Sequence, residues 1–342
     1  MSTNLTIRDD SIAHQAWMVR LYRTRAAGMV KALRAVERDI LERIERTNPE
    51  TFTRYHLEQM VTRVNDMVRE LTAVGRAQLT QDVHDVVKRE TAWLAGTINR
   101  DIPVAVDVVG PHLTAVYSAV SSSPMSGQPI RDWWSDMDRG LRSAIDREIR
   151  IGYVEGQSPM QIARRLRGTR RAGYSDGVFG RVVHRRVEAL VRTALSHAQH
   201  VAREEFYREN DDLIGGVQIV ATLDNLTSLI CMNYDGRVFP VDEGPRPPFH
   251  PNCRSTTVPV VKSWRELGFD RDELPEGTRA SIDGQVPEAT RFPQWIAAQS
   301  EERQLQVLGR ARFDAWKAGK VALSDLTAES RVLTLAELNL DR

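Results

Sequence analysis

The chain begins with two long stretches in which apolar residues recur at helical spacing. They run from Ile12 to about Thr47 and from about Tyr55 to Ile98, with few helix-breaking residues. In the second stretch the apolar positions alternate steps of four and three, as in a heptad seam: Leu57, Val61, Val64, Val68 and Leu71. The pattern predicts two long helices. It leaves open whether they form a projecting hairpin or coiled-coil arm, or the core-facing helices of a bundle.

Helical patterns resume in the middle of the chain, at residues 135–156, and a clear helix start follows. Ser158 suits an N-cap, Pro159 suits the first helical position, and Gln161 stands where a capping box requires it. The same string resembles the opening of a helix-turn-helix, but no clear recognition helix follows at the usual spacing. We therefore interpret it as a capped connecting helix.

The pattern changes from helical to extended after a further helix predicted at residues 185–210. GGVQIVATL alternates and is rich in β-branched residues, and GRVFPV and RSTTVPVV also read as extended, with Pro, Gly and Asn in the joins. Helical patterns return in residues 292–319 and in a final LTLAEL at 333–338. The sequence therefore predicts a mainly α protein with a small β unit, of the α+β class.

These patterns divide the 342 residues into four parts, because a chain of this length can bury more than one core. Residues 1–105 are predicted to be an N-terminal helical arm or hairpin, and residues 106–212 a helical linker region. Residues 213–262 are predicted to be a compact three-stranded unit that carries a Cys/His loop. Residues 263–342 are predicted to be a C-terminal helical extension.

Net charge is close to zero, with 47 Lys and Arg against 46 Asp and Glu, so any signal for a polyanion must be local. One arginine-rich stretch stands out: Arg164, Arg165, Arg167, Arg170, Arg171, Arg181, Arg185, Arg186 and Arg192. Arginine without lysine favours bidentate contacts with phosphate or carboxylate. The stretch is therefore interpreted either as a DNA-binding surface or as a set of salt bridges to acidic helices or a partner subunit. The glycine-rich segment 168–181 within it is predicted to be mobile or ordered by a partner.

Membrane insertion and secretion are not expected from this sequence. The first residues lack the apolar core of a signal peptide, and no run of about 18 apolar residues occurs. Only two cysteines are present, so a disulfide-stapled secreted fold is not expected either. We expect a protein that is made in, and remains in, a cytoplasm.

The string FHPNCRSTTVPV, residues 249–260, contains part of a metal-site pattern. His250 and Cys253 have the spacing of a ligand pair, and Cys231 lies 22 positions before Cys253. Serines stand at 228 and 255, where a further thiol ligand would be expected, so a fourth ligand would have to be a carboxylate from Asp224 or Asp235. We favour two buried thiols and a histidine that pack a proline-rich loop without a cofactor. Zinc held by Cys231, His250, Cys253 and Asp235 is the alternative.

Catalysis is not expected. HPN at 250–252 has a superficial likeness to a His-Asn-His nuclease, but such a site needs further metal ligands, and His250 is the only histidine after His200. We find no phosphate-binding loop, no dinucleotide glycine motif and no nucleophile elbow. A metal-dependent nuclease or other hydrolase is thus the least favoured alternative.

Three strings, taken in order, resemble the phage Mu F-type head morphogenesis family, the minor capsid proteins of tailed phages. They are VRTALSHAQHVAREEFYREN, ATLDNLTSLICMNYDGRVF and PPFHPNCRSTTVPV. The positions that carry the resemblance are Arg192, Thr193, Asp224, Thr227, Cys231, Asp235, Gly236, His250, Pro251, Cys253 and Arg254. The resemblance extends from about Gly156 to the end of the chain. Many members have Cys where Ser228 and Ser255 stand, a departure that favours a structural role for the loop.

The resemblance implies a non-catalytic virion protein, present in multiple copies and located in the capsid interior at the portal vertex. The implied partners are the portal protein, the scaffolding or major capsid protein, and double-stranded DNA, with no membrane involved. It implies action in the host cytoplasm during head assembly. The alternative within the same family is a DNA-binding protein that leaves the particle when DNA is ejected.

Overall fold

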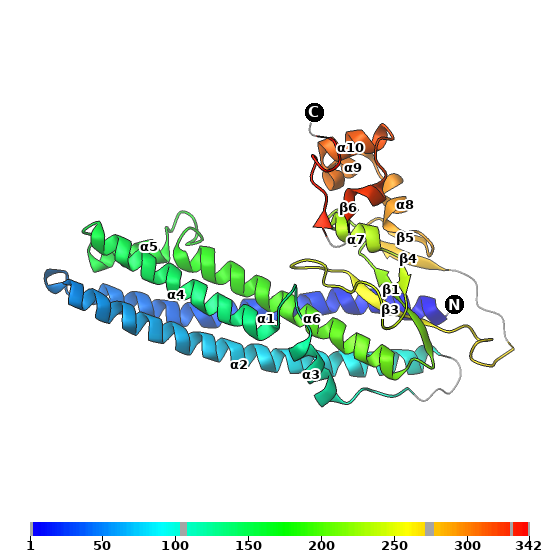
Figure 1. Cartoon of the computed structure of the whole chain (residues 1–342), viewed down its shortest axis with the longest axis horizontal. Helices are drawn as coiled ribbons and strands as arrows, with labels where there is room; N and C mark the ends of the chain where they lie inside the picture. Colours follow the sequence, from blue (N-terminus) through cyan, green and yellow to red (C-terminus); the bar gives the residue numbers. More distant parts are fainter. Residues whose placement is uncertain (1–2, 103–107, 271–276, 329–330, 341–342) are drawn as a thin grey trace. The chain divides into compact units, whose positions relative to one another are not determined.

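The computed structural model describes residues 3–102, 108–270, 277–328 and 331–340. The protein is mostly helical and carries small antiparallel sheets, as the sequence predicts (Figure 1). None of the described helices combines the length and the apolar character needed to cross a membrane.

The residues cluster into two compact units that are not continuous in sequence. One unit, here the sheet unit, comprises Met1–Val19, Val87–Val116 and His197–Arg342. The other, here the helical unit, comprises Arg20–Val86 and Tyr117–Ser196. The four-part division drawn from the sequence stays a prediction.

Two long helices, α1 (Thr3–Glu45) and α2 (Arg54–Asp101), account for most of the first hundred residues. The turn between them contains a short 3₁₀ helix, Pro49–Thr51, whose cap Asn48 accepts a hydrogen bond from the Glu50 backbone N–H at 2.9 Å. The α1 helix begins nine residues earlier than predicted, because residues 3–11 contain no helix-breaking Pro or Gly, and both ends of α2 lie within three residues of the prediction.

The helical unit is a bundle. Besides its parts of α1 and α2, it contains α4 (Ile130–Val154), α5 (Pro159–Arg167), the π-helix η2 (Phe179–His184) and the start of α6 (Arg185–Glu209). A shorter helix, α3 (Leu113–Ser122), precedes α4. Every residue of the predicted heptad seam is buried: Leu57, Val61, Val64, Val68 and Leu71.

Polar contacts show that α4 covers the seam of α2 in this unit. The Trp134 indole N–H donates to the Thr72 carbonyl at 2.8 Å, and the Arg150 guanidinium pairs with Glu58 at 2.6 Å. Gly75 leaves room for the indole, since a Cβ there would lie 2.7 Å from a Trp134 ring carbon. The seam therefore belongs to a bundle core and not to a bare two-helix arm.

The predicted start of α5 is confirmed in detail. The Ser158 hydroxyl accepts from the Gln161 backbone N–H at 3.4 Å, and the Gln161 side-chain oxygen accepts from the Ser158 N–H at 2.7 Å. The glycine-rich segment after α5 is closed by its own hydrogen bonds. Asp176 accepts from the Thr169 N–H at 2.8 Å and from its hydroxyl at 2.7 Å, and these bonds lower the pKa of Asp176.

The sheet unit contains the predicted three-stranded antiparallel sheet, with strand order β2–β1–β3. Its strands are β1 (Ile214–Val220), β2 (Val238–Phe239) and β3 (Thr256–Val261), and the short helix α7 (Leu229–Tyr234) lies between β1 and β2 in sequence. One core cluster joins this sheet to the ends of α2 and α6 and includes Leu94, Ile98, Phe206, Tyr207, Val217, Val261 and Trp264.

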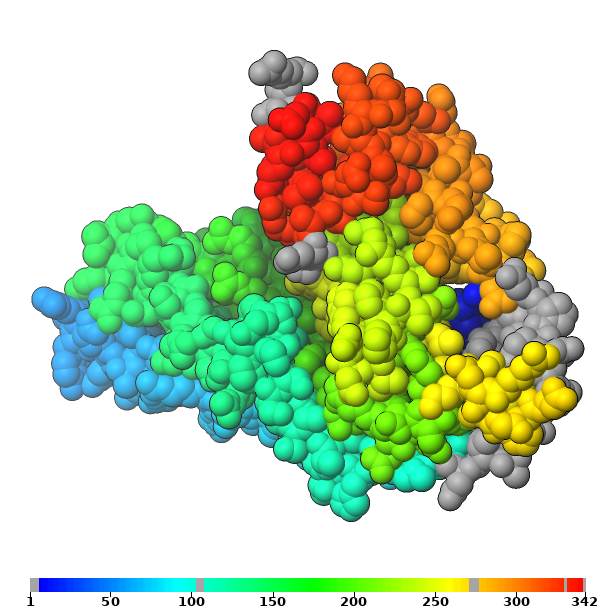
Figure 2. Space-filling model, turned by 45° about the vertical axis from the view of Figure 1, so that its right-hand side comes forward, coloured from blue at the N-terminus to red at the C-terminus, as the bar shows by residue number. Residues whose placement is uncertain are grey.

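The C-terminal region differs from the predicted helical extension. It contains a hairpin of β4 (Thr278–Ser281) and β5 (Gly284–Pro287), then α8 (Phe292–Ala297), α9 (Glu301–Leu308) and α10 (Arg310–Lys317). A 3₁₀ turn, Leu323–Leu326, precedes an antiparallel pair of short strands, β6 (Thr327–Ala328) and β7 (Arg331–Val332). Figure 2 shows the residues from α8 onward, orange to red, gathered into one compact lobe.

Two local features explain these differences. Gly309 takes φ +74°, a conformation that favours glycine, and so ends α9 and separates it from α10. The predicted helix at 333–338 is wrong. Thr334 and Glu337 close a turn there instead, because the Glu337 carboxylate accepts from the Thr334 N–H at 2.8 Å and from its hydroxyl at 2.9 Å.

A buried polar network fixes the helices of the sheet unit to β3. The Arg203 guanidinium pairs with Glu90 at 2.5 Å and donates to the Thr257 carbonyl, and both charged side chains are fully shielded from solvent. His14 and Gln199 also contact the Glu90 carboxylate, at 2.7 and 3.0 Å. Burial alone would raise the pKa of Glu90, but Arg203 and these partners hold it below its usual value.

His200, one turn before Arg203, predicts a pH dependence of stability. Burial lowers the pKa of His200 from 6.5 to about 3. Below pH 6.5 the unfolded chain therefore binds a proton at His200, whereas the folded chain does not. The contribution of His200 to stability is thus fully present above pH 6.5 and is lost as the pH falls toward 3. Between pH 7 and pH 5 this one residue should cost about 2 kcal/mol of unfolding free energy. Urea titrations at pH 7 and pH 5 measure this difference in unfolding free energy, and His200→Leu should reduce it by about 2 kcal/mol. The exposed His112→Leu serves as control. A His200→Leu variant that loses as much stability between the two pH values as the wild type would contradict the assignment.

Candidate functional site

The Cys/His loop is positioned by α7 on one side and by the β2–β3 connection on the other. Ser228 caps α7, because its hydroxyl accepts from the Cys231 backbone N–H at 3.2 Å, and this places Cys231 in the first turn. The His250 carbonyl accepts from the Cys253 N–H at 3.1 Å, with Asn252 in the left-handed region at φ +61°. The HPNC string is thus a tight turn that directs the His250 and Cys253 side chains to the same side.

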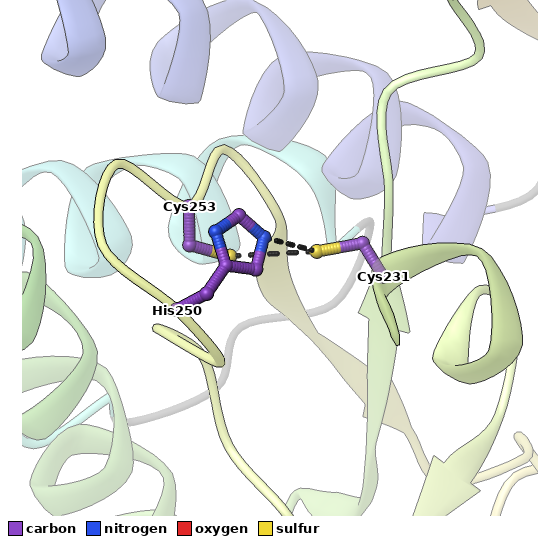
Figure 3. A group of neighbouring side chains, drawn as sticks. All are labelled: Cys231, His250 and Cys253. Atoms are coloured by element: carbon purple, nitrogen blue, oxygen red, sulfur yellow. Dashed lines mark hydrogen bonds between the residues drawn. The ribbon is translucent and has the colours of Figure 1, made fainter. Parts of the chain in front are cut away.

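Three side chains converge at this loop (Figure 3). The Cys231 sulfur lies 3.2 Å from His250 Nε2 and 3.6 Å from the Cys253 sulfur. Both cysteines are buried and unbridged, and His250 is partly buried. Within the described residues, these are the three that could hold a metal ion together, with all ligand atoms within 4.8 Å of one another.

The cluster is electrostatically asymmetric. The Cys231 thiol lies in hydrogen-bond contact with Cys253, which lowers the pKa of Cys253 well below its usual value and raises that of Cys231. Burial also raises the pKa of Cys231. The neighbouring Cys253 sulfur in turn raises the pKa of His250. A thiolate at Cys253 is therefore favoured by the Cys231 thiol and by the protonated form of the His250 ring.

Arg254, next to the cluster, connects the loop to the segment before α7. Its guanidinium makes a bidentate pair with Asp224, at 2.6 and 2.7 Å. Thr227 donates to the same carboxylate at 3.1 Å. Burial opposes ionisation of Asp224, but the Arg254 hydrogen bonds and charge keep its pKa below the usual value. The structure thus brings together Asp224, Thr227 and Arg254, which lie in two separate segments of the family motif.

Asp235 does not join the Cys/His cluster. Its buried carboxylate accepts from the backbone N–H groups of Ala221 and Phe292, at 2.8 and 2.7 Å, and pairs with Arg279 at 3.0 Å. Gly236 follows with φ +74°, and a Cβ there would lie 2.8 Å from the Arg291 side chain. Asp235 therefore joins the end of β1 to β4 and α8, and it is not available as a fourth ligand.

Pro251 contributes its carbonyl oxygen to the Cys/His loop, where it lies 2.9 Å from His250 Nδ1.

Sequence reasoning missed Arg279 as the partner of Asp235. The two residues lie 44 positions apart, and a lone arginine in a short polar hairpin carries no local signal of burial.

Arg192 and Thr193 belong to the helical unit, in the α6 helix. Arg192 pairs with Glu188 at 3.3 Å, and the Thr193 hydroxyl donates to the Ala189 carbonyl at 2.7 Å. Two further arginines of the predicted patch are also paired: Arg165 with Glu148 at 3.0 Å, and Arg167 with Glu45 at 2.6 Å. For these three arginines, the salt-bridge interpretation holds.

The rest of the arginine patch is exposed: Arg164, Arg170, Arg171, Arg181, Arg185 and Arg186. Across the described ranges none of the six has a carboxylate within salt-bridge distance. Arg185 also lines an open groove of about 610 Å³ with Lys31, Arg34 and Arg38 of α1. Glu37 is the one acidic residue of its lining, and it already contacts His184 at 2.8 Å. We call this feature the basic groove.

The sequence did not single out the α1 residues of the basic groove as a basic patch, because acidic residues lie beside them in the linear sequence. Spacings of three and four nevertheless put Lys31, Arg34 and Arg38 on one helix face, and this was the signal available.

Asp235→Ala tests the structural role of the Asp-Gly position. Removing the carboxylate leaves Arg279 buried without its counter-charge and two backbone N–H groups without an acceptor, so unfolding free energy should fall by about 3–5 kcal/mol. The control is Asp242→Ala, whose carboxylate is 75% exposed and pairs with Arg208, and which should change stability by less than about 1 kcal/mol. Chemical denaturation of both variants measures the difference. Equal, small effects would contradict this role.

A family model described as Phage Mu protein F like protein matches residues 143–258. The matched segment begins within α4 and ends within β3, and it contains α5, α6, α7 and the whole Cys/His loop. No curated protein and no solved structure matches the chain significantly. The resemblance of residues 259–342 stays a prediction. Residues 143–258 are a Phage Mu protein F-like domain, and that family consists of phage head morphogenesis proteins.

Proposed function

We propose that the protein is a structural minor capsid protein of a tailed phage, which associates with the portal vertex and the head interior during assembly. The observation that carries the proposal is the Phage Mu protein F-like domain at residues 143–258. Its proposed location is the capsid, reached from the host cytoplasm, and its proposed partners are the portal protein together with the scaffolding or major capsid protein.

The polar residues of the domain support a structural role. Asp224 and Arg254 neutralise each other, and Asp235 is fully used by Arg279 and two backbone N–H groups. Such contacts fix one loop geometry, because a buried charge without its partner is strongly destabilising. The Asp224–Arg254 and Asp235–Arg279 pairs thereby hold the fold.

Co-purification tests the portal association. Tagged full-length chain should retain the portal protein in lysates of infected cells, and the two pure proteins should form a complex on size exclusion. The Asp242→Ala variant, changed at an exposed loop position, should behave like the wild type. Folded protein that captures no portal protein in either experiment would contradict the proposal.

The basic groove favours a second candidate function, contact with double-stranded DNA. Lys31, Arg34, Arg38 and Arg185 gather positive charge around one open cavity. Among the residues that the structure describes, the guanidinium groups of Arg34, Arg38 and Arg185 have no carboxylate within salt-bridge distance, so they are available for phosphate. The exposed arginines 170 and 171 lie in the segment whose Gly173, Tyr174 and Ser175 line the same groove. A protein that contacts packaged DNA in the head, or one ejected with it, would use this surface.

Charge removal tests the groove. Arg34→Gln, Arg38→Gln and Arg185→Gln together should weaken binding to a DNA duplex and reduce the slope of log K against log salt by about one unit for each phosphate that the variant no longer neutralises. The charge-matched control replaces Arg46, Arg69 and Arg139, which are exposed but paired with Glu42, Asp66 and Asp136. Fluorescence anisotropy at several salt concentrations measures both sets. Equal slopes for the two triple variants would reject the groove as the DNA-binding surface.

A further inference from the structure

We propose that Cys231, His250 and Cys253 bind one thiophilic divalent ion, of which zinc is the natural example, with an exchangeable oxygen ligand in the fourth position. This inference is independent of portal or DNA binding, since it rests on the geometry of one side-chain cluster in the sheet unit. It goes against the cofactor-free packing that the sequence favours.

The distances suit a shared ion. Tetrahedral zinc with bonds of about 2.3 Å to sulfur and about 2.0 Å to nitrogen separates two sulfurs by about 3.8 Å and a sulfur from a nitrogen by about 3.6 Å. Here the sulfurs of Cys231 and Cys253 are 3.6 Å apart, and Cys231 sulfur and His250 Nε2 are 3.2 Å apart. All three ligand atoms lie within 4.8 Å of one another, so modest side-chain shifts would place them around one centre. A disulfide would need the sulfurs to approach to about 2.05 Å.

The imidazole is already oriented as a ligand. His250 Nδ1 lies 2.9 Å from the Pro251 carbonyl oxygen, which can only accept, so Nδ1 carries the proton and donates it. In the neutral ring Nε2 then presents its lone pair to the Cys231 sulfur (Figure 3). Metal-bound histidines commonly donate their second nitrogen to a backbone carbonyl in this way, because that bond fixes both tautomer and ring orientation.

Among the described residues, Ser228 offers an oxygen ligand close to the three proposed ligands. The Ser228 hydroxyl lies 2.9 Å from His250 Nε2. The Asp224 and Asp235 carboxylates are not free to bind the ion, because Asp224 pairs with Arg254 and Asp235 pairs with Arg279. A neutral hydroxyl binds zinc far more weakly than a thiolate does, so the fourth ligand should be water or a weakly held serine oxygen.

The proposed ion would connect the first turn of α7 to the loop that leads into β3. Apart from Cys231 and Cys253, the apolar contacts at this point are few: Ala221 is buried beside them, and Phe249 packs against the group from outside. A small apolar cluster contributes little stability, and metal coordination supplies folding free energy directly. Binding should therefore stabilise the loop.

The test uses the full chain and Co²⁺ as a spectroscopic probe, with Zn²⁺ in competition. Reduced protein should take up one Co²⁺ per chain, with thiolate-to-metal absorption in the near ultraviolet, and Zn²⁺ should displace it. Cys253→Ser should lose that absorption. Ser228→Cys supplies a thiolate at the open position and should tighten metal binding at least tenfold. Ser121→Cys, which adds a thiol at an exposed position of α3, should not.

The Ser228→Cys variant keeps the proposal falsifiable if Cys253→Ser fails to fold, because it leaves Cys231, His250 and Cys253 in place. Absence of Co²⁺ uptake by folded, reduced wild-type protein would overturn the proposal. So would equal metal affinities of Ser228→Cys and Ser121→Cys. A rise in thermal unfolding temperature on Zn²⁺ addition, abolished by chelator, is the result expected for the wild type.

Discussion

The fully buried ion pair between Glu90 and Arg203 is the interaction on which the sheet unit depends. Glu90 comes from α2 and Arg203 from α6, and the same guanidinium donates to the Thr257 carbonyl of β3. Tyr207 donates to that carbonyl as well, at 3.3 Å. A buried pair of this kind adds little net stability compared with an apolar core, but removing either partner leaves an uncompensated charge. It therefore specifies one arrangement of helices against the strand that follows Cys253.

This constraint extends to the Cys/His loop through the backbone. Thr257 lies four residues after Cys253, so holding β3 also fixes the C-terminal end of the HPNC turn. On the other side, Asp235 holds the C-terminal end of α7, four residues after Cys231, by its contacts with Ala221 and Arg279. The cluster thus lies between two buried, charge-paired anchors. This geometry is compatible with a Cys/His loop that only stabilises the fold and also with one that binds a metal ion.

Much of the fold could be predicted from the sequence, because apolar periodicity, helix caps and strand patterns depend on residues close to one another in the chain. The seam from Leu57 to Leu71, the cap at Ser158 and the three extended strings all report on their own neighbourhoods, and each was confirmed. The His250 and Cys253 pair was also predictable, since its spacing is a local property, and Cys231 was included because the sequence has only one other cysteine. What could not be predicted depends on distant partners. Nothing near Asp235 identifies Arg279, and nothing near Arg185 identifies Arg34 and Arg38. The final LTLAEL failed because Thr334 and Glu337 form a capping-type turn that needs no following helix.

A structural role for this chain in the phage head, at the portal vertex, is most directly tested by cryo-electron microscopy. The measurement is a map of the portal vertex in heads assembled with the chain, compared with heads assembled without it. We expect additional helical density in contact with the portal, into which the α4–α6 bundle and the three-stranded sheet can be fitted. Identical portal density in both kinds of head, with the chain present elsewhere in the particle or absent from it, would contradict that role.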